Sequence, residues 1–151
     1  MNKKTLQNGF TLIELIIVMV ILGIMAAVAV PRYLDSIENA EASAEDAVIT
    51  AIRAGLKQAA NNSLLENGRA TWPENPFDAL AEKPVGFTED SDLADTDGEW
   101  TFDFNGGQIT HQRADNSRFT WDYDYGILES EMEDDAEIGT LGPRVQVAPA
   151  S

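Results

Sequence analysis

The chain has 151 residues, a formal net charge of −16 and no cysteine. That length leaves room for one modest domain beside a membrane segment, and so acidic a surface disfavours binding to nucleic acids, because it repels phosphate groups. The absence of cysteine excludes disulfides, thiol catalysis and thiolate metal sites.

Residues 1–9 form a polar leader in which Lys3 and Lys4 favour a cytoplasmic N-terminus. An ordinary secretory signal has an apolar core of about 7–15 residues followed by a small-residue cleavage site. Here the small residue, Gly9, lies before a longer apolar run. Cleavage after Gly9 would therefore keep the apolar helix on the product. The loss of two positive charges and no acid would take the net charge from −16 to −18.

Residues 10–30 are apolar apart from Glu14. A helix of about 20 apolar residues is long enough to cross the hydrocarbon core of a bilayer. Because the burial of each large apolar side chain is worth about 1.5–3 kcal/mol, this segment is not expected to stay bare in water. The sequence therefore predicts a helix that lies in lipid or against copies of itself.

The carboxylate of Glu14 has two interpretations. A charge near the bilayer centre costs at least about 2.5–3.5 kcal/mol, so it needs a partner or a shallow position. In one interpretation, Thr11 and Glu14 form a capping box at the positive end of the helix dipole. In the other, cleavage after Gly9 creates an amine on Phe10, and each Glu14 pairs with the Phe10 amine of a neighbouring chain.

This arrangement resembles the N-terminal signature of bacterial type IV pilins and type II secretion pseudopilins. The resemblance covers roughly the first quarter of the chain and rests on Gly9, Phe10-Thr11-Leu12-Ile13-Glu14, the long apolar run, Gly23 and Pro31-Arg32-Tyr33. It implies cleavage by prepilin peptidase between Gly9 and Phe10, N-methylation of Phe10, and a role for Glu14 in methylation and subunit registration. It also implies that the helix can lose regularity between Gly23 and Pro31 in a filament, which fits the missing amide donor of proline.

The same resemblance implies the partners and the location of the protein. The chain would form a helical homo-oligomer, and it would meet a prepilin peptidase, an inner-membrane assembly platform and a motor. It would begin as a single-pass inner-membrane protein and end in a cell-surface pilus or a periplasmic pseudopilus. No cofactor is expected, and the sequence does not separate adhesion, motility, DNA uptake and secretion as roles.

Residues 31–62 are predicted to continue the helix, with one face packed on a domain. Apolar positions recur at spacings of three and four: Tyr33, Ile37, Ala40, Ala44, Val48, Ala51, Ile52, Leu56 and Ala59. Charged positions mostly fall elsewhere: Asp35, Glu38, Glu41, Glu45, Asp46, Arg53 and Lys57. The helix is expected to end near residue 62, or one turn later at Asn67 and Gly68. A free amphipathic coiled coil is the alternative, disfavoured because the later strands need a cover.

Residues 63–99 form a long connection that contains three X-Pro pairs and many acids. Loops of this length usually have a function or local structure of their own. Phe77, Leu80 and Phe87 are expected to pin the connection to the core, with one helical turn at 78–82. The resemblance to pilins places the variable, surface-displayed part of the molecule here.

The acids at the end of this connection suggest calcium by charge density alone: Asp90, Asp92, Asp95, Asp97 and Glu99. The spacing of an EF-hand is not met, because taking Gly98 as its glycine puts Leu93 at the first ligand position and Phe104 at the last. We therefore expect a solvated acidic loop and assign no metal ligand. A calcium site of another kind, such as some pseudopilins hold in their sheet loops, stays open.

Residues 100–126 are predicted to form an antiparallel meander, with turns at 105–107 and 115–117. Aromatic residues alternate with polar ones on its first and last strands: Trp100, Phe102, Phe104, Phe119, Trp121, Tyr123 and Tyr125. Such alternation is typical of a half-buried sheet, so we expect the aromatic face to pack on the helix rather than bind a ligand. The single histidine, His111, is expected to be a plain strand residue, because one histidine without cysteine supports neither a zinc site nor a catalytic set.

Residues 127–151 are acidic and then rich in small residues, and are predicted to form a partly flexible tail. No nucleophile motif or phosphate loop occurs, so no catalytic residue and no enzymatic activity are expected. The sequence predicts an α+β fold in which a long N-terminal helix, its first half membrane-embedded, packs on a small antiparallel sheet. The expected function is that of a pilus-like filament subunit. A secretion pseudopilin and a membrane-anchored binding domain that never polymerises are the alternatives.

Overall fold

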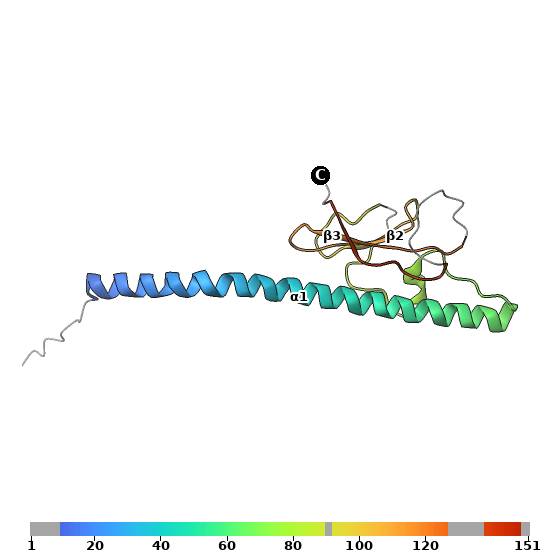
Figure 1. Cartoon of the computed structure of the whole chain (residues 1–151), viewed down its shortest axis with the longest axis horizontal. Coiled ribbons are helices and arrows are strands. Elements are labelled where there is room, and N and C mark those ends of the chain that lie inside the picture. The colour runs from blue at the N-terminus through green and yellow to red at the C-terminus, as the bar shows by residue number, and fades with distance from the viewer. Residues whose placement is uncertain (1–9, 90–91, 127–137, 149–151) are drawn as a thin grey trace, which may run out of the picture. The chain divides into compact units, whose positions relative to one another are not determined.

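The structure is a computed structural model that describes residues 10–89, 92–126 and 138–148. Its elements are the helix α1 (Leu12–Asn67), the 3-10 helix η1 (Pro76–Ala79) and the strands β1 (Trp100–Asp103), β2 (Gln108–Gln112), β3 (Arg118–Asp122) and β4 (Val145–Val147) (Figure 1). The chain divides into two units, residues 1–43 and residues 44–151. The predicted α+β class, with a long N-terminal helix and a small antiparallel sheet, is confirmed.

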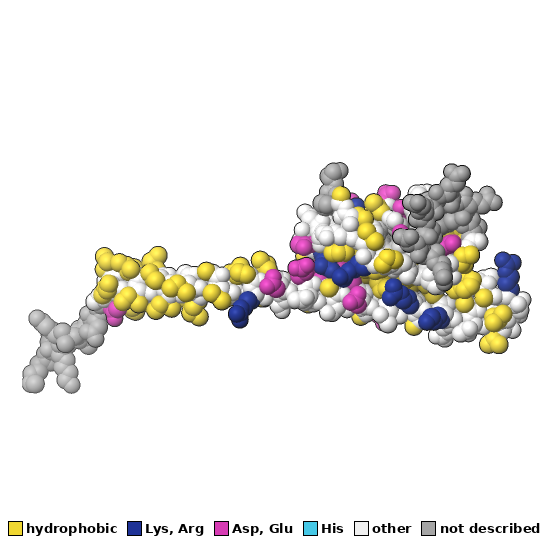
Figure 2. All heavy atoms as spheres, in the orientation of Figure 1, with side chains coloured by type: hydrophobic (Ala, Val, Ile, Leu, Met, Phe, Trp, Pro, Cys, Tyr) yellow, Lys and Arg dark blue, Asp and Glu magenta, His cyan; other side chains and the backbone are white. Residues whose placement is uncertain are grey.

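The described part of the first unit is residues 10–43, of which residues 10–30 are the apolar segment. No side chain from Phe10 to Ala40 is buried, and Figure 2 shows a nearly continuous apolar surface over the start of the helix, followed by charged side chains. By length and composition α1 could cross a membrane. The helix continues through Pro31, although proline removes one backbone donor. By itself, this segment leaves its apolar side chains without cover.

In the second unit, α1 turns one narrow face toward the sheet. The buried residues of that face are Glu45, Ile49, Ile52, Leu56 and Ala60. The predicted stripe is therefore only partly right: Ile52 and Leu56 are buried, but Ala44 and Ala51 are exposed. Ile49 and its neighbours bury more apolar area than a stripe of alanines would, which decides the rotation of the helix. The assignment of Glu45 to the polar face is wrong.

The four strands lie in the order β1-β2-β3-β4, all antiparallel. Phe102 lies opposite Ile109, which lies opposite Trp121, so these residues share a face. The core consists of Ile49, Ile52, Leu56, Phe77, Trp100, Phe102, Ile109, Trp121, Tyr123 and Leu141. The predicted packing of an aromatic face is confirmed, although Phe104 at the end of the alternation remains partly exposed.

The opposite face of the sheet is also covered. Thr101, Thr110 and Thr120 lie in line across three strands and are all buried. The backbone N–H of Ala94 donates to Oγ1 of Thr110 at 2.7 Å, and Oγ1 of Thr101 donates to the carbonyl of Asp92 at 2.7 Å. The expectation of a half-buried sheet was therefore wrong, because the end of the long connection folds over the polar face and satisfies its hydroxyl groups.

The segment after residue 137 contributes to the fold. β4 pairs with β3, and Leu141 forms a bridge with Tyr123 and enters the core. The expected tail, residues 127–151, therefore contains a strand that the sequence did not predict, because three residues are too few to show a period. Residues 127–137, the most acidic part of that tail, lie outside the described residues.

The connection between helix and sheet has local structure, as expected. α1 ends at Asn67, the later of the two predicted ends and beyond the boundary expected at residue 62. The helical turn predicted at 78–82 lies slightly earlier, as η1, where the side chain of Asn75 accepts a hydrogen bond from the N–H of Phe77. Phe77 is completely buried, which confirms its predicted role in pinning the connection to the core.

Candidate assembly segment

The start of α1 has the geometry of a capping box. Oε2 of Glu14 accepts hydrogen bonds from the backbone N–H of Thr11 at 2.9 Å and from its hydroxyl at 2.7 Å. The N–H of Glu14 in turn donates to Oγ1 of Thr11 at 3.3 Å. Two backbone donors at the helix start are thereby satisfied. The first of the two interpretations of Glu14 thus describes the single chain.

The residue before this cap is the most exposed of the apolar segment. Phe10 is 86% exposed, whereas Gly9 lies outside the described residues. A Cβ at Gly23 would meet no heavy atom within 4 Å. Phe10 and a Cβ at Gly23 thus face open space, and among the described residues only Thr11 is hydrogen-bonded to the Glu14 carboxylate. A chain exposing these residues can bury them only in a lipid phase or against other molecules.

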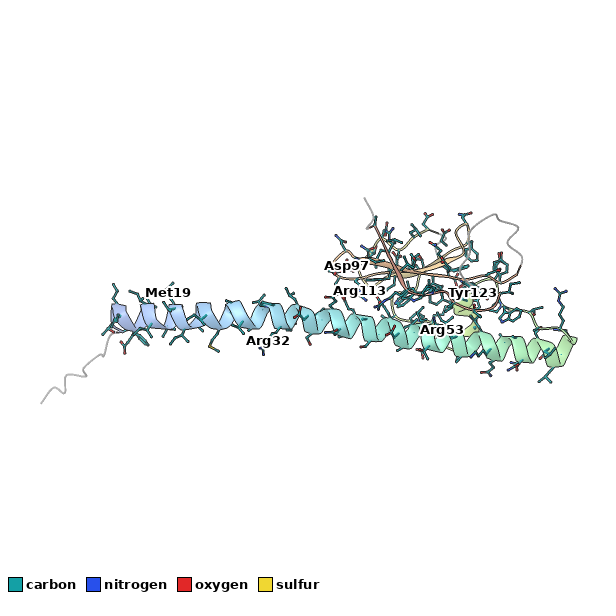
Figure 3. All side chains as sticks on the ribbon, in the orientation of Figure 1. Met19, Arg32, Arg53, Asp97, Arg113 and Tyr123 are labelled. Atoms are coloured by element: carbon teal, nitrogen blue, oxygen red, sulfur yellow. The ribbon has the colours of Figure 1, made fainter. Side chains whose placement is uncertain are left out.

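A second set of charges, which the sequence did not predict, surrounds Glu45 in the second unit. One of its members, Arg113, is labelled in Figure 3. The carboxylate is completely buried. Arg113 donates from Nε to Oε1 and from Nη2 to Oε2, each at 2.6 Å. Arg144 donates from Nη1 to Oε2 at 3.1 Å, and Nδ1 of His111 lies 2.9 Å from Oε1. The helix, β2 and the segment before β4 are joined through this one side chain.

The surroundings explain the electrostatics of this cluster. Burial by itself raises the pKa of Glu45, but the hydrogen bonds and charges of Arg113 and His111 outweigh it and lower the pKa to about 2. The ring of His111 stacks on Trp100 with centroids 4.2 Å apart, and the guanidinium of Arg113 lies 4.0 Å above the ring centroid of Phe119. The prediction of a plain strand role for His111 misses this contact. The cluster holds elements together, and its described members include no nucleophile.

One signal in the sequence could have revealed this cluster. Glu45 lies four residues before Ile49, which lies three before Ile52, so the glutamate continues the apolar stripe. A charged residue on an apolar stripe is either exposed at its end or buried with partners of opposite charge. The sequence could not name Arg113 and Arg144 as those partners.

At the acidic end of the connection, the carboxylate of Glu99 is engaged in local hydrogen bonds. The carboxylate of Glu99 accepts from the hydroxyl of Thr88 at 2.7 Å and from the N–H groups of Asp95 and Thr96 at 3.0 and 3.2 Å. Burial raises the pKa of Glu99, but these hydrogen bonds outweigh burial, so its pKa lies below the usual value for a glutamate. Within residues 92–126 and the other described ranges, no three acids or histidines converge to hold a metal ion. Asp90 lies outside those ranges.

The described molecule also has an open pocket of about 310 Å³ beside η1. It is lined by Glu74, Asn75, Asp78, Lys83, Glu89 and Phe104. Its one lysine, Lys83, lies 2.8 Å from a carboxylate oxygen of Asp78 and 3.7 Å from one of Glu89. The pocket offers no unpaired buried group for a ligand.

Together, the exposed apolar helix with its capped start and the small α+β unit define a pilin-like protein. Residues 4–30 match the family model described as the prokaryotic N-terminal methylation motif. The resemblance to type IV pilins and type II secretion pseudopilins is confirmed.

The curated relatives come from both systems. The chain is 46% identical over 81 residues to "Type IV major pilin protein PilE1" of Neisseria gonorrhoeae, a match covering 54% of this chain and 46% of that protein. It is 39% identical over 93 residues to "Fimbrial protein" of Pseudomonas aeruginosa, covering 62% and 56%. It is 37% identical over 87 residues to "Type II secretion system core protein G" of Aeromonas hydrophila, covering 58% of each.

The chain thus spans about half the length of these relatives. Their names describe fimbrial and secretion-system proteins rather than enzymes. No solved structure matches the chain significantly.

Proposed function

We propose that this protein is a structural subunit of a type IV pilus-like filament. The proposal rests mainly on the helix that begins at Leu12. Its apolar side chains are exposed along a length sufficient to cross a bilayer. The match of residues 4–30 to the N-terminal methylation motif supports processing of this end. In this proposal prepilin peptidase cuts between Gly9 and Phe10, and Phe10 is then N-methylated.

Assembly follows from the environments in which the helix is stable. Lipid tails and neighbouring apolar helices are similarly apolar, so transfer from bilayer to filament changes the free energy of the helix little, and packing and polar pairs set its direction. A motor and an inner-membrane platform supply the work. Before assembly the chain is anchored in the inner membrane with Lys3 and Lys4 in the cytoplasm.

Glu14 performs both of its predicted roles in this proposal. Its Oε2 holds the cap with Thr11, while a carboxylate can accept about four hydrogen bonds through its two oxygens. The other oxygen, Oε1, therefore accepts a hydrogen bond from the methylated amine of Phe10 of a neighbouring subunit. This pair sets the register between the two helices. The cap orients the carboxylate, and its loss would disorder both contacts.

The remaining boundaries are proposed on the same basis. Residues 10–30 are the assembly half of the helix, 31–62 its amphipathic half, 63–99 the connection, 100–126 the meander and 127–151 the tail. The open space at Gly23 and the missing donor at Pro31 allow α1 to lose regularity between them when copies pack closely. That change would occur in the filament, since α1 is continuous in the single chain.

The first test is mass spectrometry of the N-terminal peptide from two fractions, sheared surface material and washed membranes. We expect a peptide that begins at methylated Phe10 and is abundant in the sheared fraction. An intact leader beginning at Met1 in both fractions would contradict the proposal.

A variant separates a polymerising subunit from a simple membrane anchor. Glu14→Ala should still be inserted, but filament yield should fall at least tenfold, because a pair worth about 1.4 kcal/mol per contact changes an equilibrium tenfold. The matched control is Glu66→Gln, an exposed glutamate on the same helix outside the apolar segment. Normal filament yield from Glu14→Ala would rule out the Glu14–Phe10 pair and favour a binding domain that never polymerises.

A type II secretion pseudopilin is the second candidate, favoured by the similarity to core protein G, which extends over 58% of both chains. This candidate predicts the same methylated peptide confined to the membrane fraction. The two candidates share their processing and their helix and differ in the length and location of the filament.

A further inference from the structure

Charged residues are segregated along α1. Residues 33–46 contain five acids and no lysine or arginine, whereas residues 47–65 contain Arg53 and Lys57 and no acid. Opposite charges stabilise a helix when they lie three or four residues apart, and neither cation has an acid at those spacings. Arg53 and Lys57 instead lie four residues apart and repel each other weakly. The segregation does not stabilise the single helix.

Within the described residues of the second unit, neither cation has an acidic partner. Arg53 and Lys57, here called the basic pair, are both exposed, and Arg53 is labelled on α1 in Figure 3. Nη2 of Arg53 donates to the carbonyl of Gly142 at a long 3.4 Å. Lys57 has no hydrogen bond or ion pair with any described residue. By contrast, Lys83 is paired with Asp78.

A matching pair of acids lies earlier on the helix. Asp35 and Glu38, here called the acidic pair, are exposed, and their carboxylates make no ion pair within the described part of the chain. Parallel copies packed in register would place acid beside acid and cation beside cation. A stagger of 18 residues places Arg53 beside Asp35 of the next copy, and one of 19 places Lys57 beside Glu38. Both correspond to about 27–29 Å along parallel helices.

We propose that the basic pair of one subunit binds the acidic pair of a neighbouring copy in the filament. This contact rests on the proposed function, since it requires parallel helices. The Glu14–Phe10 pair needs a stagger of only four residues, about 6 Å, so the two contacts join each subunit to different neighbours. Subunits this acidic repel one another, and unpaired cations placed against unpaired acids offset that repulsion where the helices pack.

Cysteine cross-linking tests the stagger directly, because the natural chain has no cysteine. We combine Glu38→Cys with Lys57→Cys, which leaves the Arg53–Asp35 contact intact, and oxidise sheared filaments. Each chain should link to two different copies and give a ladder of many covalent multimers on a denaturing gel. Either single variant should give dimers at most. The matched control, Glu38→Cys with Thr50→Cys, has a wrong stagger of 12 residues at an exposed position and should give no ladder.

Charge reversal tests whether the contact contributes to assembly. Arg53→Glu with Lys57→Glu should reduce filament yield at least tenfold while the membrane-inserted pool remains. Adding Asp35→Lys and Glu38→Lys should restore the yield to within threefold of the natural chain. Arg69→Glu, which reverses an exposed cation outside the basic pair, should change it less than twofold.

The outcomes separate this contact from the proposed function. Normal filaments that give no ladder, or a reversed basic pair that assembles normally or is not rescued, would overturn the contact alone. An unprocessed leader and the absence of any filament from the natural chain would overturn the proposed function and the contact with it.

Discussion

The two units of this protein treat glutamate on the same helix in opposite ways. Glu14 is exposed, and its carboxylate accepts hydrogen bonds from Thr11, three residues earlier, and from no other described residue, whereas Glu45 is completely buried and contacts three distant side chains. In the apolar segment of the first unit, residues 10–30, the side chains point outward, and local hydrogen bonds satisfy its single charge. In the second unit the apolar side chains form a core, and the buried charge needs long-range partners. The second unit is completed by its own chain, whereas the first leaves its apolar side chains exposed.

The largest effect in this comparison should follow from Glu45→Ala. The substitution leaves Arg113 and His111 buried without their carboxylate, and breaking a buried pair by removing one partner costs about 3–5 kcal/mol. Denaturant unfolding of the detergent-solubilised chain, followed by tryptophan fluorescence, measures the loss. Glu38→Ala, at an exposed glutamate, should change the free energy of unfolding by less than about 0.5 kcal/mol. An equally small change in the free energy of unfolding for Glu45→Ala would show that the cluster does not stabilise the second unit.

Alanine substitutions at two isoleucines of α1 should differ almost as much in their effect on the free energy of unfolding. Ile52 is completely buried in the core, and Ile52→Ala should lower the free energy of unfolding by about 2–5 kcal/mol through lost burial and a cavity. Ile17 is 50% exposed in the single chain, and Ile17→Ala should leave that unfolding transition unchanged. The same fluorescence titration compares them. If Ile17→Ala destabilised the second unit, the apolar segment would contribute to the stability of that unit, and the two units would not be distinct in this respect.

Acid should affect the second unit through Glu45. The pKa of Glu45 is lowered from 4.5 to about 2 on folding, so its contribution is complete above the unfolded pKa and is lost as the pH falls toward the folded one. We expect about 3 kcal/mol of stability to disappear between about pH 5 and pH 2. The pKa values of Glu99 and Asp115 are also lowered, so these groups lose stability in acid as well. The natural chain is therefore compared with Glu45→Gln, which should not show the loss of stability that comes from Glu45. Equal pH slopes for both proteins would refute the assignment.

The smallest effect should separate two glycines of α1. A Cβ at Gly55 would overlap the backbone carbonyl of Ala79 in η1, so Gly55→Ala should destabilise the second unit by about 1–3 kcal/mol. Gly23→Ala meets no atom in the single chain and should favour the helix by up to about 1 kcal/mol. Circular dichroism and denaturant unfolding measure the two changes. A stabilised Gly55→Ala protein would show that η1 can move away from the helix.

Much of the fold could be predicted from local patterns. The apolar run, the capping box of Thr11 and Glu14, and the alternation around Trp100 and Trp121 each lie within one continuous stretch of the sequence. The rotation of α1 could not be predicted, because two adjacent stripes of the helix are apolar and only contact with the sheet selects the one containing Ile49. β4 could not be predicted either, since its pairing partner β3 is needed to see it.

The sequence by itself determined that the apolar segment, residues 10–30, requires an apolar environment and that its single charge lies near the helix start. Length, composition and local hydrogen bonding decide these properties, and all of them can be read from one continuous stretch of the chain. Only the tertiary structure decided that Glu45 is buried, because its partners His111, Arg113 and Arg144 are 66, 68 and 99 residues away. A buried charge is tolerated where folding brings opposite charges and hydrogen-bond donors to it, and that meeting depends on the path of the whole chain.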